Sequence, residues 1–292
     1  MAIELVTKYL PYVDELFKAE SKRALVTNQD FSWAGAKTIK VYKIGTSEMH
    51  NYDRAGTGTG ASRYGTIGSL DAETETMLMK NDRSFTFVID KLDTDETGRA
   101  LESASALARQ LREVTVPEVD AYVYGVMAAK AGTKPEAVTL TPENIYDEII
   151  KATTTLDDAE VPENGRVLSV TPAVYQIMKK SKEIILNSNI GEDMRLKGVI
   201  SNLDGMNVVK VPSSRMPQNF GFMVSHPKAT VSPVKLADYR THKDPPGISG
   251  DLVEGRIVYD AFVLENKAKA IYYQANKPAS AQTTPTTPEG QS

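Results

Sequence analysis

The stretch SFTFVIDKLDTDETGRALESASALARQLREV, residues 84–114, decides how the chain is interpreted. Residues 84–90 alternate large apolar side chains with smaller or polar ones, which predicts a strand with one buried face. Asp93 and Glu96 then have the spacing of a helix N-cap and the acidic residue three positions later. Alanine and leucine recur at three- and four-residue spacing as far as Val114. This stripe predicts a helix of about five turns with one apolar face.

The segment before this stretch has a different character. Residues 37–44 alternate β-branched and polar side chains, which predicts a strand. A polar, glycine-rich segment follows from residue 45 to residue 82. Loops longer than about 15 residues are uncommon inside a compact domain and are usually functional or disordered. An extended hairpin that reaches over a neighbouring molecule would also explain this length.

The segment after this stretch is expected to mix helices and strands. A second helix should begin at Pro117, because proline is favoured in a first helical turn, and should end near Gly132. A β-hairpin is expected over residues 254–273, with its turn at Asn266 and Lys267. The other expected elements are a helix from Thr141, strands at 166–170, 206–211 and 220–225, a helix at 172–181, and a tail at 275–292 whose Pro- and Thr-rich composition predicts disorder.

The composition excludes several classes of function. The chain has 292 residues, 41% of them hydrophobic, and a formal net charge of −4. A protein that grips nucleic acid tightly normally carries a basic excess, which this chain does not have. The absence of cysteine excludes disulfides and thiolate chemistry. Neither a signal peptide nor a membrane-spanning stretch is evident, which predicts a soluble product of the cytoplasm.

The glycine run GTGTG, residues 56–60, could suggest a phosphate-binding loop. A dinucleotide-binding loop needs a strand before it and a helix after it, whereas polar residues lie on both sides here. No Gly-Lys-Ser or Gly-Lys-Thr ending follows. A flexible loop explains the run better.

Acidic residues form two groups that could suggest a metal site. The group of Asp90, Asp93, Asp95 and Glu96 lacks the glycine that a calcium loop needs at its sixth position, so a strand end and a helix cap explain it better. The second group is interpreted as a solvated loop. Its members are Asp157, Asp158, Glu160 and Glu163.

The three histidines, His50, His226 and His242, do not form a metal-binding or catalytic pattern. They show no His-x-x-x-His or His-Glu-x-x-His spacing, and the chain has no Gly-x-Ser-x-Gly motif. No catalytic, cofactor-binding or metal-binding residue is therefore expected, and the chain is not expected to be an enzyme.

Several stretches, taken in order, resemble the major capsid proteins of tailed bacteriophages, which have the Hong Kong 97-type fold. Each stretch is weakly specific alone, and their order makes the resemblance more specific over about residues 5–273. The stretches are KYL at 8–10, LF at 16–17, Ser21, NQDF at 28–31, AKTIKV at 36–41, FVIDKLDTDET at 87–97, VPEVDAY at 116–122, HP at 226–227, PVKL at 233–236, DPPG at 244–247, EGR at 254–256 and YDAFVL at 259–264.

The resemblance implies an α+β fold with an N-terminal arm, an extended β-hairpin loop, a peripheral domain with a long spine helix, and an axial domain. The implied boundaries are 1–35 for the arm, 36–44 for a peripheral-domain strand, 45–82 for the extended loop, 83–139 for the peripheral domain with the spine helix, 140–249 for the axial domain, 250–274 for a hairpin that returns to the peripheral domain, and 275–292 for the disordered tail.

The resemblance also implies a function. The chain would assemble with itself as hexamers and pentamers into an icosahedral head, formed in the host bacterial cytoplasm, and would contact the packaged double-stranded DNA weakly and without specificity. A portal protein is an implied partner. Because the arm begins at Met1, there is no room for the scaffolding segment of some relatives, so a separate scaffolding protein is expected. Arg54, Arg63 and Tyr64 are the expected inter-subunit contacts, since Arg and Tyr favour interfaces.

Two alternatives stay open. An encapsulin-like bacterial nanocompartment shares the fold and would package enzyme cargo instead of DNA. A soluble α/β enzyme with an unrecognised site is the less favoured alternative, and it would be a stable monomer or dimer with a turnover activity.

Overall fold

The computed structural model describes residues 21–28, 38–44, 47–56, 62–65, 72–91, 103–186 and 202–277. The chain divides into two compact units. We call Trp33–Lys80 the excursion, and we call the unit formed by Met1–Ser32 and Asn81–Ser292 the body.

The excursion contains a two-stranded antiparallel ribbon. Strand β1 (Thr38–Ile44) pairs with β2 (Ala72–Leu78) in continuous register along its whole length. The strand expected at residues 37–44 is therefore confirmed. The polar segment between the two strands is the connection of a long hairpin.

A three-stranded antiparallel sheet forms one layer of the body. Strand β10 (Gly250–Tyr259) is central, with β3 (Asn81–Asp90) on one side and β9 (Val234–Lys243) on the other. The alternation expected at the end of β3 is confirmed, because Ile89 is 8% exposed whereas Val88 is 50% exposed. One face of this sheet is therefore buried and the other is open.

A glycine in β10 makes room for an aromatic ring on the buried face. Gly255 lies opposite Phe85 of β3, and a Cβ added to Gly255 would be 2.3 Å from the Phe85 ring. Leu107 and Leu111 of the long helix form an apolar cluster with Val253, and Phe85 packs against that cluster. The ring thus covers the glycine and fills the space between sheet and helix.

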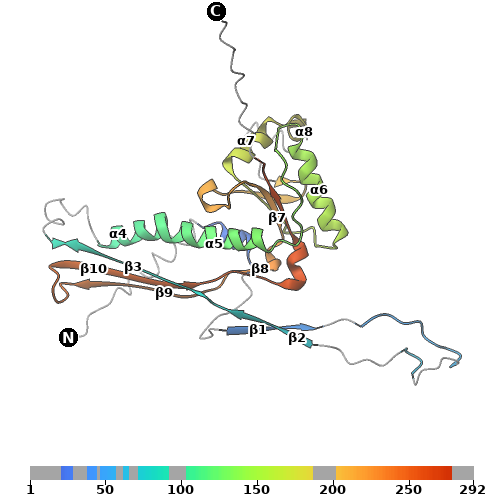
Figure 1. The fold of residues 1–292 in the computed structure, drawn as a ribbon, viewed down its shortest axis with the longest axis horizontal. Helices are drawn as coiled ribbons and strands as arrows, with labels where there is room; N and C mark the ends of the chain where they lie inside the picture. The colour runs from blue at the N-terminus through green and yellow to red at the C-terminus, as the bar shows by residue number, and fades with distance from the viewer. Residues whose placement is uncertain are drawn as a thin grey trace, which may run out of the picture. The chain divides into compact units, whose positions relative to one another are not determined.

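The long helix runs without a break from α4 (Ser103–Gln110) through a π-helical turn (Leu111–Thr115) into α5 (Val116–Ala129). The expectation of a separate helix beginning at Pro117 is therefore wrong. A proline inside an α-helix removes one hydrogen bond and its ring clashes with the carbonyl four residues earlier. The π turn just before Pro117 relieves this conflict by changing the hydrogen-bond ladder. At 1.5 Å per residue the combined helix is about 40 Å long, and Figure 1 shows it lying along the three-stranded sheet.

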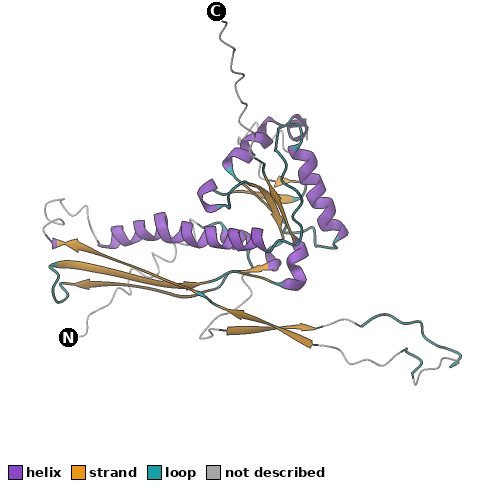
Figure 2. Cartoon of the chain, in the orientation of Figure 1, coloured by secondary structure: helices purple, strands orange, loops and turns teal. Residues whose placement is uncertain are grey.

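The body also contains a mixed five-stranded sheet, in the order β12-β7-β4-β6-β5. Strands β4 and β6 are parallel and the other neighbours are antiparallel. The helices α6 and α7 lie beside this sheet (Figure 2). The elements are α6 (Ile145–Asp158), β4 (Val167–Val170), α7 (Pro172–Lys180), α8 (Lys182–Leu186), β5 (Asn202–Leu203), β6 (Met206–Lys210), β7 (Phe220–Ser225) and β12 (Ile271–Ala275). These positions confirm the strands and the helix expected between residues 166 and 225.

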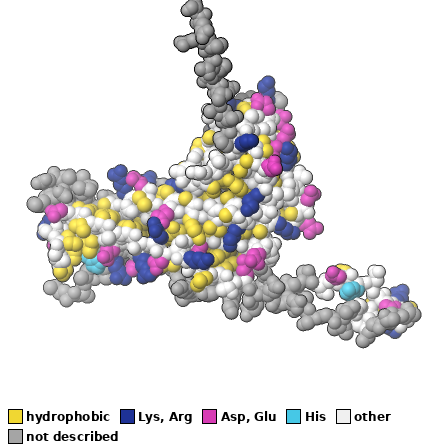
Figure 3. Space-filling view, viewed as in Figure 1, with side chains coloured by type: hydrophobic (Ala, Val, Ile, Leu, Met, Phe, Trp, Pro, Cys, Tyr) yellow, Lys and Arg dark blue, Asp and Glu magenta, His cyan; other side chains and the backbone are white. Residues whose placement is uncertain are grey.

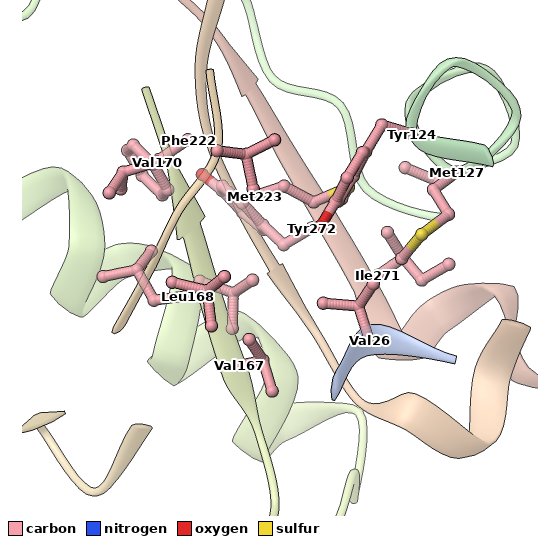
Figure 4. Close-up of a cluster of buried hydrophobic side chains, with 14 of the residues drawn as sticks. Val26, Tyr124, Met127, Val167, Leu168, Val170, Phe222, Met223, Ile271 and Tyr272 are labelled. Atoms are coloured by element: carbon pink, nitrogen blue, oxygen red, sulfur yellow. The ribbon is translucent and has the colours of Figure 1, made fainter. Parts of the chain in front are cut away.

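The main core of the body lies around the five-stranded sheet. Figure 4 shows side chains of β4, β7 and β12 together with Tyr124 and Met127 of α5. Leu168, Phe222 and Ile271 are completely buried. The core therefore joins the sheet to the C-terminal half of the long helix.

The prediction of a β-hairpin over residues 254–273 is wrong. Both edges of β10 are occupied by β3 and β9, so β12 pairs with β7 in the other sheet. The expected turn residues, Asn266 and Lys267, lie in the 3-10 helix η4 (Glu265–Ala270). The remaining short elements are α2 (Arg23–Val26), η2 (Ser213–Arg215), η3 (Pro227–Ala229), β8 (Thr230–Val231) and β11 (Phe262–Val263), of which β8 and β11 pair with each other.

Strand β9 was not expected from the sequence. Because β9 and β10 are adjacent strands of one sheet, the boundary expected at residue 249 falls inside their hairpin. The segment 250–274 is not a single hairpin, since β10 and β12 lie in different sheets. The domain boundaries stay predictions.

Candidate assembly surfaces

The segment that connects β1 to β2 is locally folded at residues 47–56 and 62–65, which we call the tip. The Asp53 N–H donates to the Arg63 carbonyl at 2.9 Å, which ties its two halves together. The Tyr52 and Tyr64 rings lie 5.0 Å apart at an interplanar angle of 66°, an edge-to-face arrangement. The tip therefore has a defined structure of its own.

Two glycines permit this local fold. Gly65 has a φ of +95°, and a Cβ there would lie 2.6 Å from the His50 ring. Gly56 has a φ of +68°, and its N–H donates to the Asp53 carboxylate at 2.8 Å. Glycine adopts such backbone angles at no steric cost. The first glycine of the GTGTG run thus has a role in a turn, and the run's other two glycines lie outside the described residues.

The tip exposes the three side chains expected to contact another subunit. Arg54, Arg63 and Tyr64 are all exposed, Tyr64 by 79%. In the tip, the Arg63 carbonyl accepts from the Asp53 N–H and the Tyr64 ring packs on the Tyr52 ring. Among the described residues, no backbone hydrogen bond or ring contact joins Arg54 to Arg63 or Tyr64. Sequence reasoning missed Met49, which is 98% exposed, and Tyr52, which is 53% exposed. Large apolar residues in an otherwise polar segment were the available signal, because Met, Tyr and Arg are enriched at interfaces.

The open face of the three-stranded sheet is a second exposed surface, and it is largely charged. Arg256 of β10 donates from Nε to Asp82 of β3 at 2.9 Å. On β9, an Nη2 of Arg240 lies 2.7 Å from Asp238. Exposed pairs of this kind contribute little to stability. Val88 adds an exposed apolar side chain to the same face, so the surface mixes charge with some apolar area.

The histidines have structural surroundings. His226 is 8% exposed, its Nδ1 accepts from the Lys228 N–H at 3.2 Å, and its Nε2 lies 3.2 Å from the Asn164 carbonyl. Burial lowers the pKa of His226 below its ordinary value of 6.5. His242 lies 3.4 Å from a carboxylate oxygen of Glu254 in β10, and the His50 ring lies beside Gly65 within the tip. Each histidine thus sits on a different element.

The acidic run is only partly a solvated loop, because Asp157 and Asp158 are the last two residues of α6. Asp157 accepts from the guanidinium of Arg166 at 2.7 Å, and the Arg166 side chain is 3% exposed. Asp158, Glu160 and Glu163 are exposed, as expected. The carboxylate of Asp157 therefore compensates a buried charge.

The other acidic group begins at Asp90, the last residue of β3. The expected helix cap at Asp93 and the acidic residues after it fall outside the described residues. Within the part of the chain that the structure describes, no three acidic or histidine side chains are grouped as a metal site would require. In the same residues, no helix combines the length and apolar character needed to cross a membrane.

Comparison with known proteins establishes the fold. No protein-family model and no curated protein sequence matches the chain. The capsid structure of Cyanophage P-SCSP1u is similar at a TM-score of 0.68 and 14% identity, over 87% of each chain. The mature capsid of bacteriophage PhiM1 is similar at a TM-score of 0.65 and 13% identity, over 87% of this chain and 84% of that one. A virus-like particle from Pyrococcus furiosus is similar at a TM-score of 0.58 and 11% identity, over 91% of this chain and 97% of that one.

These similarities extend over nearly the whole of each protein. The chain therefore has the fold of phage capsid proteins, and the expected α+β, Hong Kong 97-type class is confirmed.

Proposed function

We propose that the chain is the major capsid protein of a tailed bacteriophage, which assembles as hexamers and pentamers into an icosahedral head around double-stranded DNA. The observation that carries this proposal is the similarity to the capsid structure of Cyanophage P-SCSP1u, which covers 87% of both chains. Similarity over so much of both chains argues for a shell subunit rather than for one domain shared by unrelated proteins.

The physical requirement on such a subunit is to make several weak contacts with its neighbours. In a closed shell these contacts reinforce one another, so none of them needs to be strong alone. The tip suits this task because its exposed Met49, Tyr52 and Tyr64 are held in a preformed structure, and little conformational entropy is lost when a preformed surface docks. Arg54 and Arg63 are proposed to contact the same neighbour.

The proposed partners follow from the role of a container. With a net charge of −4, the chain should contact packaged DNA weakly and without specificity. Basic and acidic side chains are interspersed on the face shown in Figure 3, in agreement with this proposal. A portal protein and a separate scaffolding protein are proposed as the other partners, with assembly in the host cytoplasm and residence in the virion. The proposed role is structural, and no residue is assigned a catalytic function.

An encapsulin-like nanocompartment shell is the second candidate function. The similarity to the Pyrococcus furiosus virus-like particle supports it. The higher TM-scores of the two phage capsids favour the phage proposal.

The test is to produce the full chain, with and without a co-expressed scaffolding protein, and to examine it by size-exclusion chromatography and negative-stain microscopy. The proposal expects closed icosahedral particles, or rings of five and six subunits. Particles from infected cells should contain double-stranded DNA, whereas a nanocompartment would contain enzyme cargo. A chain that stays monomeric or dimeric under all conditions and has a turnover activity would overturn the proposal.

A further inference from the structure

The segment of residues 21–28 is attached to helix α5 by a buried group of polar side chains. The Ser21 hydroxyl donates to one oxygen of Asp120 at 2.7 Å, and the Arg215 guanidinium donates to the other at 3.0 Å. Arg23 also acts electrostatically on this carboxylate, and the carboxylate helps to raise the pKa of Tyr124. The Asp120 side chain is 2% exposed and the Arg215 side chain 15% exposed. Three segments that are distant in sequence thus meet at one carboxylate.

Other contacts also hold this segment, which we call the clasp. Val26, the last residue of the one-turn helix α2, is completely buried in the main core (Figure 4). The Asn28 N–H donates to the Thr230 carbonyl at 2.7 Å, beside β8. The Lys22 ammonium donates to the Lys210 carbonyl at 3.2 Å. Leu25 on the same turn is 54% exposed, so the clasp is not buried on all sides.

Burial and pairing act in opposite directions on the charges of this group. Burial raises the pKa of Asp120, although the Ser21 hydrogen bond and the charges of Arg23 and Arg215 act in the opposite direction. Burial also lowers the pKa of Arg23, although Asp120 favours its charged form. Buried ion pairs often contribute little net stability for this reason, whereas removal of one partner is strongly destabilising. Opening of the clasp would hydrate these charges.

We propose that the clasp is releasable: it opens from α5 as a unit while both large sheets of the body stay folded. The charged group centred on Asp120 sets the equilibrium between the closed and the open clasp. The clasp leads into the excursion, which begins at Trp33 and rejoins the body at Asn81. Opening therefore frees one of the two ends at which the excursion is attached. In a shell this would extend the reach of the excursion toward a neighbour, and that role, unlike the opening itself, rests on the proposed function.

Hydrogen exchange of the full-length, unassembled chain, followed by mass spectrometry at neutral pH, tests the opening. The readout is the exchange of the peptide covering the clasp, whose Asn28 amide is hydrogen-bonded only while the clasp is closed. The Asp120→Asn variant keeps the side-chain shape but leaves the two arginine charges without their anion, so clasp exchange should rise at least about tenfold. Glu113→Gln is the matched control, because it neutralises an exposed carboxylate of the same long helix, paired with Arg109 at 3.0 Å, and should change nothing.

A second variant removes a charge on the clasp itself. Arg23→Gln takes away one of the charges that compensate the buried Asp120 carboxylate, so clasp exchange should rise several-fold. Unchanged clasp exchange in Arg23→Gln would overturn the inference, as would equal acceleration of β4, β7 and the clasp in Asp120→Asn. If Asp120→Asn does not fold, Ser21→Ala weakens the same group from the clasp side and should accelerate clasp exchange alone. These measurements need no particle, so their failure is distinguishable from a failure to form shells.

Discussion

Truncation of Tyr64 to alanine tests the tip as an assembly surface. Its side chain is 79% exposed and its ring packs edge-to-face on Tyr52 alone among the described aromatic residues. Loss of such a pair costs the isolated subunit about 0.5–1.5 kcal/mol at most. If the ring is buried against a neighbouring subunit, each lost contact costs about 1.5–3 kcal/mol. At 1.4 kcal/mol per factor of ten, the subunit concentration needed for assembly should rise about ten- to a hundredfold.

The assay is light scattering against subunit concentration, with thermal unfolding of the unassembled chain measured in parallel. Tyr64→Phe is the matched control, because it keeps the ring and should assemble close to the wild-type concentration. Assembly of Tyr64→Ala at the wild-type concentration, with unfolding unchanged, would refute the reasoning. A large drop in the unfolding temperature would also count against it, since the ring would then belong to the fold of the subunit.

Three further predictions concern the excursion, the sheet and a buried histidine. Deletion of residues 50–75 should leave a body that folds, by circular dichroism, but that forms no shells by microscopy; normal particles would contradict the interface role. Gly255→Val should lower the free energy of unfolding by about 1–3 kcal/mol in chemical denaturation, because its Cβ would lie 2.3 Å from the Phe85 ring; an unchanged midpoint would argue against the tight contact. Because burial lowers the pKa of His226, the folded chain binds fewer protons than the unfolded chain, and stability should fall as the pH drops from about 6.5 through the folded-state pKa. His226→Gln should flatten that dependence, and parallel melting curves between pH 7.5 and pH 5 would show that another group is responsible.

Much of the secondary structure of the body was predictable because its signals are local. Strand β3 and the leucine stripe of the long helix depend on periods of two and 3.6 residues that neighbouring side chains alone establish. The junction at Pro117 was not predictable, because the packing of the long helix decides whether a proline ends a helix or is accommodated by a π turn. The expected hairpin over residues 254–273 failed for a related reason, since both of its strands found partners distant in sequence.

The candidate assembly surfaces were also predictable from the sequence only where the signal was local. Arg54, Arg63 and Tyr64 could be named from residue type and from their place in a long polar segment, and their contact role stays a prediction. The edge-to-face pair of Tyr52 and Tyr64 could not be named, because its rings meet only when the tip folds.

The sequence by itself determined the local elements, the polar excursion and the absence of cysteine chemistry, because each depends on composition or on residues close together in the chain. Tertiary structure alone decided which strands share a sheet and which charges share a buried site. Asp120, for example, looks like an ordinary acidic residue in a first helical turn, and only folding brings Ser21 and Arg215 to it. The physical reason is that strand pairing and charge burial depend on chain segments that are distant in sequence, and no local pattern specifies which of them meet.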